Sequence, residues 1–99
     1  MVKLGIDLQE GFDHDTVILR LNGVEAFHRE GVTTRQILGL AAQFEAEVEA
    51  GFVETEIDVA TLGISARVAR DVATDTYVGV SVVGGMIHLI DSDAPFTYA

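Results

Sequence analysis

Hydrophobic and polar residues alternate with a period of two along most of this chain. In the first segment the apolar positions are Val2, Leu4, Ile6 and Leu8, and the same alternation returns over residues 16–21. A period of two places successive side chains on opposite faces of a strand, so that one face can pack against a core. The pattern therefore predicts strands rather than helices from the first residues onward.

Asn22 and Gly23 mark the tightest predicted turn. Asn-Gly between two alternating segments is a strong hairpin signal, because both central residues of a type I′ turn need a positive φ. A two-residue turn here sets Leu21 opposite Val24 and pairs Arg20 with the opposite charge of Glu25. Continued along both strands, this register gives three more pairs: Leu19 with Ala26, Ile18 with Phe27, and Val17 with His28 on the side assigned to the core.

Further alternating segments follow, each bounded by turn residues. They lie near residues 44–48, 53–59, 64–68, 76–83 and 86–90, and Gly84-Gly85 joins the last two. Residues 33–41 break the alternation. There Thr33 and Gln36 resemble a capping box, which predicts one short helical turn near residues 34–40.

Seven or eight short strands at this spacing predict an all-β fold, an antiparallel β-sandwich formed by one domain over residues 1–99. A small barrel is the alternative arrangement. Strand count and spacing are similar to those of immunoglobulin-like and transthyretin-like sandwiches. No residue motif assigns the chain to a family, and without Cys or Trp it lacks the Cys…Trp…Cys pattern of immunoglobulin domains.

Composition narrows the classes of partner. Six Lys and Arg against sixteen Asp and Glu give a formal net charge of −10. That charge disfavours nucleic acid and anionic membranes, because phosphate binding needs a basic surface. The absence of Cys excludes disulfides, Cys-ligated zinc and thiol nucleophiles. Since the pattern shows neither a secretory signal nor a membrane-spanning apolar run, a cytoplasmic location is the default prediction.

Residues 43–58 carry acidic side chains at almost every outward position. A turn at residues 50–51 would make this segment a hairpin in which like charges oppose each other, at a cost of up to about 1 kcal/mol per pair. The carboxylates of this predicted acidic stripe are Glu45, Glu47 and Glu49 on one strand and Glu54, Glu56 and Asp58 on the other, with Glu47 opposite Glu54 and Glu45 opposite Glu56.

Two interpretations of the acidic stripe are open. In the first it is a solvated face, and Arg67 on the next strand neutralises part of it. In the second, Glu45, Glu47, Glu54 and Glu56 dock onto a protein partner with a basic surface, where a field of one sign speeds encounter and selects partners. The second interpretation predicts a small, non-enzymatic protein-interaction module.

Acidic loops suggest an alternative function, binding of a cation or a small ligand. The candidate carboxylates are Asp13 and Asp15 after the first strand, and Asp91 and Asp93 after the last one. They could form one site if their loops met at one end of the sandwich, although their spacing does not match an EF-hand. No metal ion or other cofactor is therefore predicted.

Ser81 and His88 face each other in the predicted register of the last hairpin. A Ser–His pair acts as a nucleophile only with an orienting acid and an oxyanion hole. The sequence pattern supplies neither, so we predict no catalytic residues.

The last hairpin, residues 76–90, is apolar on both faces, and both faces must therefore be covered. Residues 33–41 and the Phe96–Tyr98 tail could cover the outer face, or a second copy of the chain could do so in a homodimer. Gly79 leaves room there for another backbone. The predicted self-association surface consists of Tyr77, Val83, Met86 and Ile90.

Overall fold

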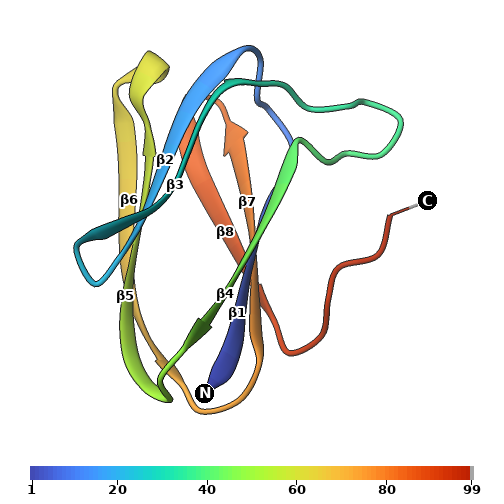
Figure 1. The fold of residues 1–99 in the computed structure, drawn as a ribbon. Coiled ribbons are helices and arrows are strands. Elements are labelled where there is room, and N and C mark those ends of the chain that lie inside the picture. Colours follow the sequence, from blue (N-terminus) through green and yellow to red (C-terminus); the bar gives the residue numbers. More distant parts are fainter. Residues whose placement is uncertain (99) are drawn as a thin grey trace.

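The computed structural model describes residues 1–98 and arranges them in two packed sheets (Figure 1). A short 3-10 turn, η1 (Ala60–Leu62), which the sequence pattern did not predict, joins two of the strands. The predicted all-β sandwich is confirmed. Its strands are β1 (Val2–Leu8), β2 (Asp15–Leu21), β3 (Val24–Val32), β4 (Ala42–Val48), β5 (Gly51–Val59), β6 (Ile64–Val72), β7 (Thr76–Val83) and β8 (Met86–Ser92).

The first sheet has the strand order β4-β1-β7-β8, and the second has the order β3-β2-β5-β6. Neighbouring strands are antiparallel, as predicted, with the exception of β1 and β7, which run parallel. β1 lies between β4 and β7 and runs parallel to β7, whose other neighbour, β8, runs in the opposite direction. β1 therefore ends, and β8 begins, at the same end of the sandwich.

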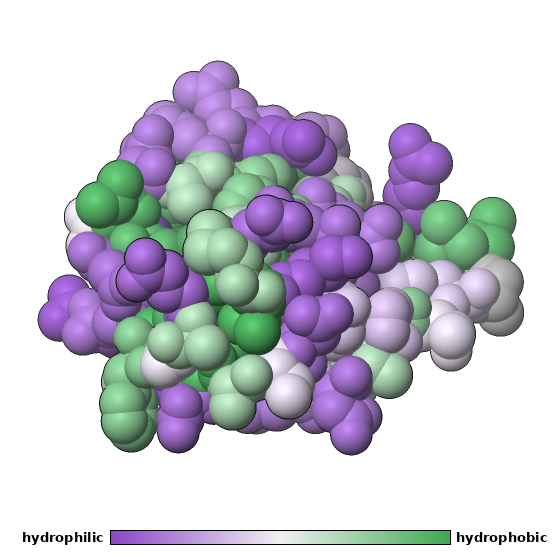
Figure 2. Space-filling view, turned by 60° about the horizontal axis from the view of Figure 1, so that its bottom comes forward, coloured by the Kyte–Doolittle hydropathy of each residue, from purple (hydrophilic) through white to green (hydrophobic). Residues whose placement is uncertain are grey.

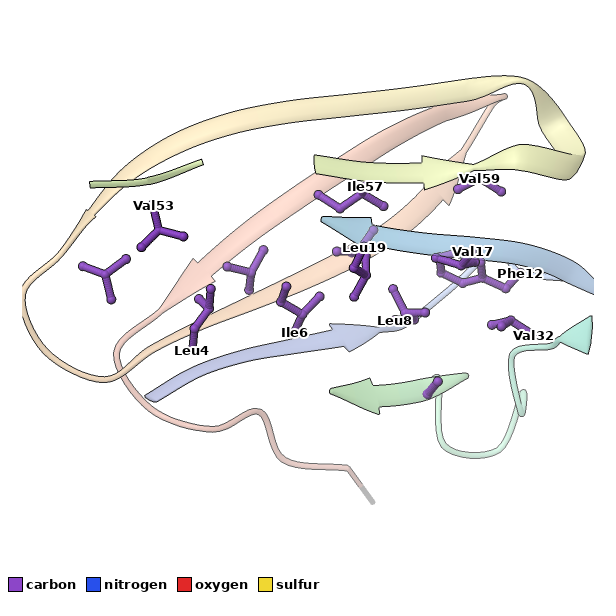
Figure 3. Packing of buried hydrophobic residues seen from close by; sticks show 14 residues of the cluster. Leu4, Ile6, Leu8, Phe12, Val17, Leu19, Val32, Val53, Ile57 and Val59 are labelled. Atoms are coloured by element: carbon purple, nitrogen blue, oxygen red, sulfur yellow. The ribbon is translucent and has the colours of Figure 1, made fainter. Parts of the chain in front are cut away.

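The inward side chains of the two sheets form one core (Figure 3). Ile6 of β1 and Leu19 of β2 are fully buried there, at 0% exposure, and alternate with outward residues as the period of two predicts. Phe12 and Val32 lie together at the end of the sandwich where β1 finishes. The other buried hydrophobic residues of this cluster are Leu4, Leu8, Val17, Ala42, Val53, Ile57, Val59, Val72, Val78 and Val80.

Different contacts close the two open sides of the sandwich. On one side Phe27 of β3 meets Phe44 of β4 edge to face, with ring centroids 5.7 Å apart. On the other side Arg70 of β6 donates two hydrogen bonds to Asp91 of β8, one of them 3.0 Å long from Nε. Arg70 points inward and its side chain is 14% exposed. An inward charge on an edge strand also discourages pairing with other sheets.

The Asn22–Gly23 hairpin forms as predicted, but its register changes after two pairs. Leu21 faces Val24 and Arg20 faces Glu25, after which a bulge at Ala26 shifts β3 by one residue. The predicted pairs beyond it are therefore wrong. The bulge turns Phe27 toward the core, where it meets Phe44, and moves His28 to the exposed outer side. The observed pairs are Leu19 with Phe27, Ile18 with His28, and Val17 with Arg29.

The predicted hairpin of residues 43–58 does not form. β4 pairs with β1 in the first sheet, whereas β5 pairs with β2 and β6 in the second, so the link at residues 49–50 crosses between sheets. In this arrangement the like-charge pairs predicted along the acidic stripe are avoided. Glu47 instead faces Lys3, and Glu56 lies between Arg20 and Arg67. Opposite charges across strands are the favourable arrangement.

Residues 33–41 form a loop closed by a single bridge between Arg35 and Leu40, and the one short helical turn predicted near residues 34–40 lies inside it. The amide of Gly39 donates to the carbonyl of Arg35 at 2.8 Å, which makes one α-turn that the chain does not continue. The predicted capping box does not form, because the Thr33 hydroxyl accepts from the amide of His14. Thr34 accepts in the same way from the amide of Phe12, so the two threonines fasten the loop to the segment after β1.

We predict that Asp91→Ala lowers the free energy of unfolding by about 1–2 kcal/mol, because it leaves the mostly buried guanidinium of Arg70 without its carboxylate. Urea denaturation measures the effect. Asp93→Ala is the matched control, an exposed aspartate two residues further on, and we expect a change within about 0.5 kcal/mol. Equal effects of the two substitutions would show that the Arg70–Asp91 pair does not hold the two sheets together.

Candidate functional site

The carboxylates of the predicted acidic stripe lie on two opposite faces of the molecule. Glu45 and Glu47 of β4 are on the outer face of the first sheet, whereas Glu54 and Glu56 of β5 are on the outer face of the second. A single flat partner therefore cannot contact all four at once. The two faces must be considered separately.

Two arginines neutralise part of the charge of the carboxylates on the second sheet. Nη1 of Arg20 lies 3.6 Å from a carboxylate oxygen of Glu56 and 3.6 Å from one of Asp58. Arg67 lies 3.6 Å from Glu54 and 3.8 Å from Glu56. Each of the three carboxylates thus has a guanidinium beside it, and this face behaves as the solvated alternative predicts, including the role of Arg67.

The carboxylates on β4 have no such partners. Within residues 1–98 no basic side chain lies within ion-pair distance of Glu45, Glu47 or Glu49. In the strand register Glu47 faces Lys3, and Glu45 faces Gly5, which has no side chain. The carboxylates of the stripe without an ion-pair partner therefore lie along β4 and the link that follows it, with Lys3 as the strand neighbour of Glu47.

An exposed apolar area adjoins the end of β4. Met1 and Phe52 are 80% and 77% exposed, and with Glu47 and Glu49 they line a hollow of about 410 Å³. Seen from this end, the molecule shows apolar residues surrounded by hydrophilic ones (Figure 2). An apolar centre with a charged rim is the usual anatomy of a protein interface.

A second feature of the first sheet is a trough along its two central strands. Gly5 of β1 and Gly79 of β7 are buried although both are outward positions. A Cβ atom on Gly5 would lie 2.7 Å from the ring of Tyr77, and one on Gly79 would lie 2.6 Å from the side chain of Gln9. The glycines thus make room for these two side chains. Gly79 admits a side chain rather than the second backbone that the sequence suggested.

The C-terminal tail, residues 93–98, lies over this trough, on the outer side of the first sheet (Figure 1). The Tyr98 hydroxyl donates to the buried carboxylate of Asp7 at 2.6 Å and accepts from Gln9 at 3.1 Å. Gln43 donates to the same Asp7 oxygen at 3.3 Å. The prediction that the tail packs back onto the sandwich is therefore confirmed.

The tail and the sheet enclose an open cavity of about 320 Å³. Two carboxylates, Asp7 and Glu45, line it together with two aromatic residues, Tyr77 and Phe96. Gly5, Gln43 and Pro95 complete the lining. The sequence pattern did not predict this cavity, because its residues come from three strands and the tail. The glycines inside β1 and β7 were the signal that some group approaches the sheet closely there.

The tail also changes the predicted self-association surface. Tyr77 is only 9% exposed. Its ring lies over Gly5 and lines the cavity under the tail, and so it is not available to a second copy. Val83, Met86 and Ile90 are 54%, 66% and 59% exposed, so the outer end of the last hairpin remains uncovered within the described chain. The homodimer stays a prediction, with its surface reduced to these three residues.

The four candidate metal ligands do not come together. Asp13 and Asp15 follow β1, at the end where β8 begins, whereas Asp91 and Asp93 are at the other end of β8. The Asp15 carboxylate instead accepts from Thr61 and from the amide of Asp13. Among residues 1–98 there is no group of three or more His, Asp or Glu side chains that could hold a metal ion.

Ser81 and His88 are opposite each other, as the predicted register requires. The Ser81 hydroxyl accepts a hydrogen bond from the amide of Glu10 at 3.2 Å, and His88 is exposed. Ser81 therefore fastens the segment after β1 to the sheet, which accounts for a hydroxyl at this position.

Comparisons with protein-family models, with curated proteins and with solved structures found no match to this chain. In the part of the chain that the structure describes, no helix is long and apolar enough to cross a membrane. The features of the molecule that bear on function are the two outer faces, the hollow beside β4 and the cavity under the tail.

The hydrogen bonds of the tail predict a dependence on pH. Partial burial, followed by the hydrogen bond to Asp7, raises the pKa of Tyr98 from 10.0 to about 12. The neutral phenol is the form that the folded protein favours. Its contribution to tail docking is therefore complete below pH 10 and is lost as the pH rises through about 12.

We expect the phenolate of Tyr98 to appear near pH 12 in a Tyr77→Phe variant, where Tyr98 is the one tyrosine left, as measured by ultraviolet absorbance. Adding Asp7→Asn should move the transition toward pH 10, because the carboxylate no longer disfavours the phenolate. The same transition in both proteins would contradict the Tyr98–Asp7 contact.

Proposed function

We propose that this protein is a small, acidic, non-enzymatic interaction module that docks a basic protein partner on its first sheet. The docking surface consists of Glu45, Glu47 and Glu49 of β4 and its link, together with the apolar residues Met1 and Phe52 at the end of the sandwich, where Phe52 of β5 reaches the same hollow from the second sheet. The observation that carries the proposal is the contrast between the two outer faces. The carboxylates of β5 have guanidinium partners, and those of β4 have none.

The contrast bears on function because intramolecular ion pairs and partner binding compete for the same carboxylates. A partner that docked on the second sheet would have to displace Arg20 or Arg67, or accept a face on which these arginines already neutralise part of the charge. On the first sheet the carboxylates are exposed and unpaired within the described chain. Their field attracts a cationic surface and accelerates the encounter.

The hollow beside β4 indicates the rest of the partner's chemistry. Phe52 and Met1 expose apolar area next to Glu47 and Glu49. A segment that carries apolar side chains flanked by Lys or Arg complements this surface in both shape and charge. Apolar contact supplies affinity at the centre, and charge selects the partner at the rim.

Two variants with the same change in charge test the proposal. Glu45→Gln, Glu47→Gln and Glu49→Gln together remove three charges from β4 and its link. Glu54→Gln, Glu56→Gln and Asp58→Asn together remove three charges from β5. Each protein and the native chain are immobilised, and the proteins that they capture from a cell lysate at physiological salt are identified. The affinity of each captured protein is then measured as salt is raised.

We expect a basic partner that the native chain and the β5 variant bind alike and that the β4 variant loses by about tenfold or more, with affinity falling as salt increases. Phe52→Ser in the native background should weaken the same complex. Equal loss of partner binding in the two charge variants would show that binding depends on the net charge of the protein and not on the β4 face, against the proposal. Loss in the β5 variant alone would place docking on the other face, against the proposal.

A further inference from the structure

We propose that the cavity beneath the C-terminal tail is a recognition pocket for one cationic side chain, an arginine guanidinium. This inference deepens the proposed function and rests on it, because it names the group of the basic partner that the first sheet would bind. The pocket is formed by Gly5, Asp7, Glu45, Tyr77 and Phe96, with Gln43 and Pro95 at its margin.

The carboxylates define the charge of the ligand. Asp7 is 93% buried, since its exposure is 7%, and it lines the cavity. Both hydrogen bonds that it accepts, from Tyr98 and Gln43, go to Oδ2. No donor within residues 1–98 contacts its other oxygen, Oδ1. Asp7 thus lines the cavity with one carboxylate oxygen that accepts no hydrogen bond from the described chain, which favours a ligand that brings N–H groups and positive charge.

Glu45 provides a second carboxylate on the adjacent strand. It is exposed, it has no ion-pair partner in the described chain, and it opposes Gly5, over which the ring of Tyr77 lies. A planar guanidinium presents several N–H donors at once and can therefore contact two carboxylates, which a compact ammonium does less well.

The aromatic residues favour the same ligand. Tyr77 and Phe96 line the cavity from the sheet and from the tail, respectively. Aromatic faces attract cations, and a guanidinium can also stack on them. A divalent metal ion fits less well, because the cavity offers two carboxylates and no third acidic or imidazole ligand.

The size of the cavity is consistent with a single side chain. Its volume of about 320 Å³ is at the lower limit for small-molecule sites, about 300–1,000 Å³. The tail forms one wall through Pro95 and Phe96, so the pocket exists only while Tyr98 holds the tail on Asp7. Binding of the cation and docking of the tail should therefore support each other.

The test uses a defined probe rather than an unidentified partner. Nuclear magnetic resonance follows the backbone amides of the native chain during titration with N-acetyl-arginine amide. The uncharged analogue N-acetyl-citrulline amide has nearly the same shape, and N-acetyl-lysine amide has the same charge. We expect saturable shifts at Gly5, Glu45, Tyr77 and Phe96 with the arginine probe, weaker binding of the lysine probe, and none with citrulline.

Glu45→Gln and Glu47→Gln form a matched pair of variants on the same strand. Glu45 lines the cavity under the tail, whereas Glu47 lines the other hollow. We expect Glu45→Gln to weaken arginine binding about tenfold, because it removes a charge-assisted contact. Glu47→Gln should change it by less than about twofold. Phe96→Leu keeps the apolar contact and removes the aromatic ring, and should also weaken binding.

Three results would overturn the inference: no saturable shift, equal binding of citrulline, or equal effects of Glu45→Gln and Glu47→Gln. These outcomes are separable from failure of the proposed function. Loss of partner capture in the triple β4 variant, without arginine binding in the cavity, would support the docking face and refute the pocket. If the native chain binds arginine in the cavity but the triple β4 variant captures the same partners, the pocket is supported and the docking face is refuted.

Discussion

Two sheets that bury their inner faces against each other must leave two outer faces pointing in opposite directions, and the assignment of each strand to a sheet decides what those faces carry. In this chain the link between β4 and β5 crosses from one sheet to the other. The crossing separates consecutive acidic strands by the thickness of the core, about 10 Å. One set of carboxylates then lies beside Arg20 and Arg67, and the other remains unpaired within the described chain. The docking surface follows from that asymmetry.

The same sheet also holds the tail. Outward glycines at the centres of β1 and β7 leave a trough, and the side chains that fill it, together with Asp7, form the floor on which Tyr98 docks. A buried carboxylate is costly unless donors satisfy it. The tail supplies one of those donors and at the same time forms a wall of the cavity. Stability of the tail and access to the cavity are therefore linked through a single residue, Asp7.

Local patterns predicted the strands and the type I′ turn, because period and turn chemistry act over a few residues. Asn22 and Gly23 both have the positive φ that this turn requires. The alternation did not reveal the bulge at Ala26, which places Phe27 against Phe44, a ring that is distant in the sequence. The alternation also could not distinguish a hairpin at residues 50–51 from a link that crosses between the sheets. The like-charge pairs that the hairpin would form were a sign against the hairpin. Local patterns could not predict the cavity, because only the tertiary fold brings its residues together.

Cross-strand nuclear Overhauser effects in the native protein test the central claim, the separation of the acidic strands, most directly. The fold predicts contacts from Lys3 to Glu47 and from Glu56 to both Arg20 and Arg67, because these residues are strand neighbours. It predicts none between Glu47 and Glu54. A cross-strand contact between Glu47 and Glu54 would restore a single acidic hairpin and would contradict the two-face account of this protein.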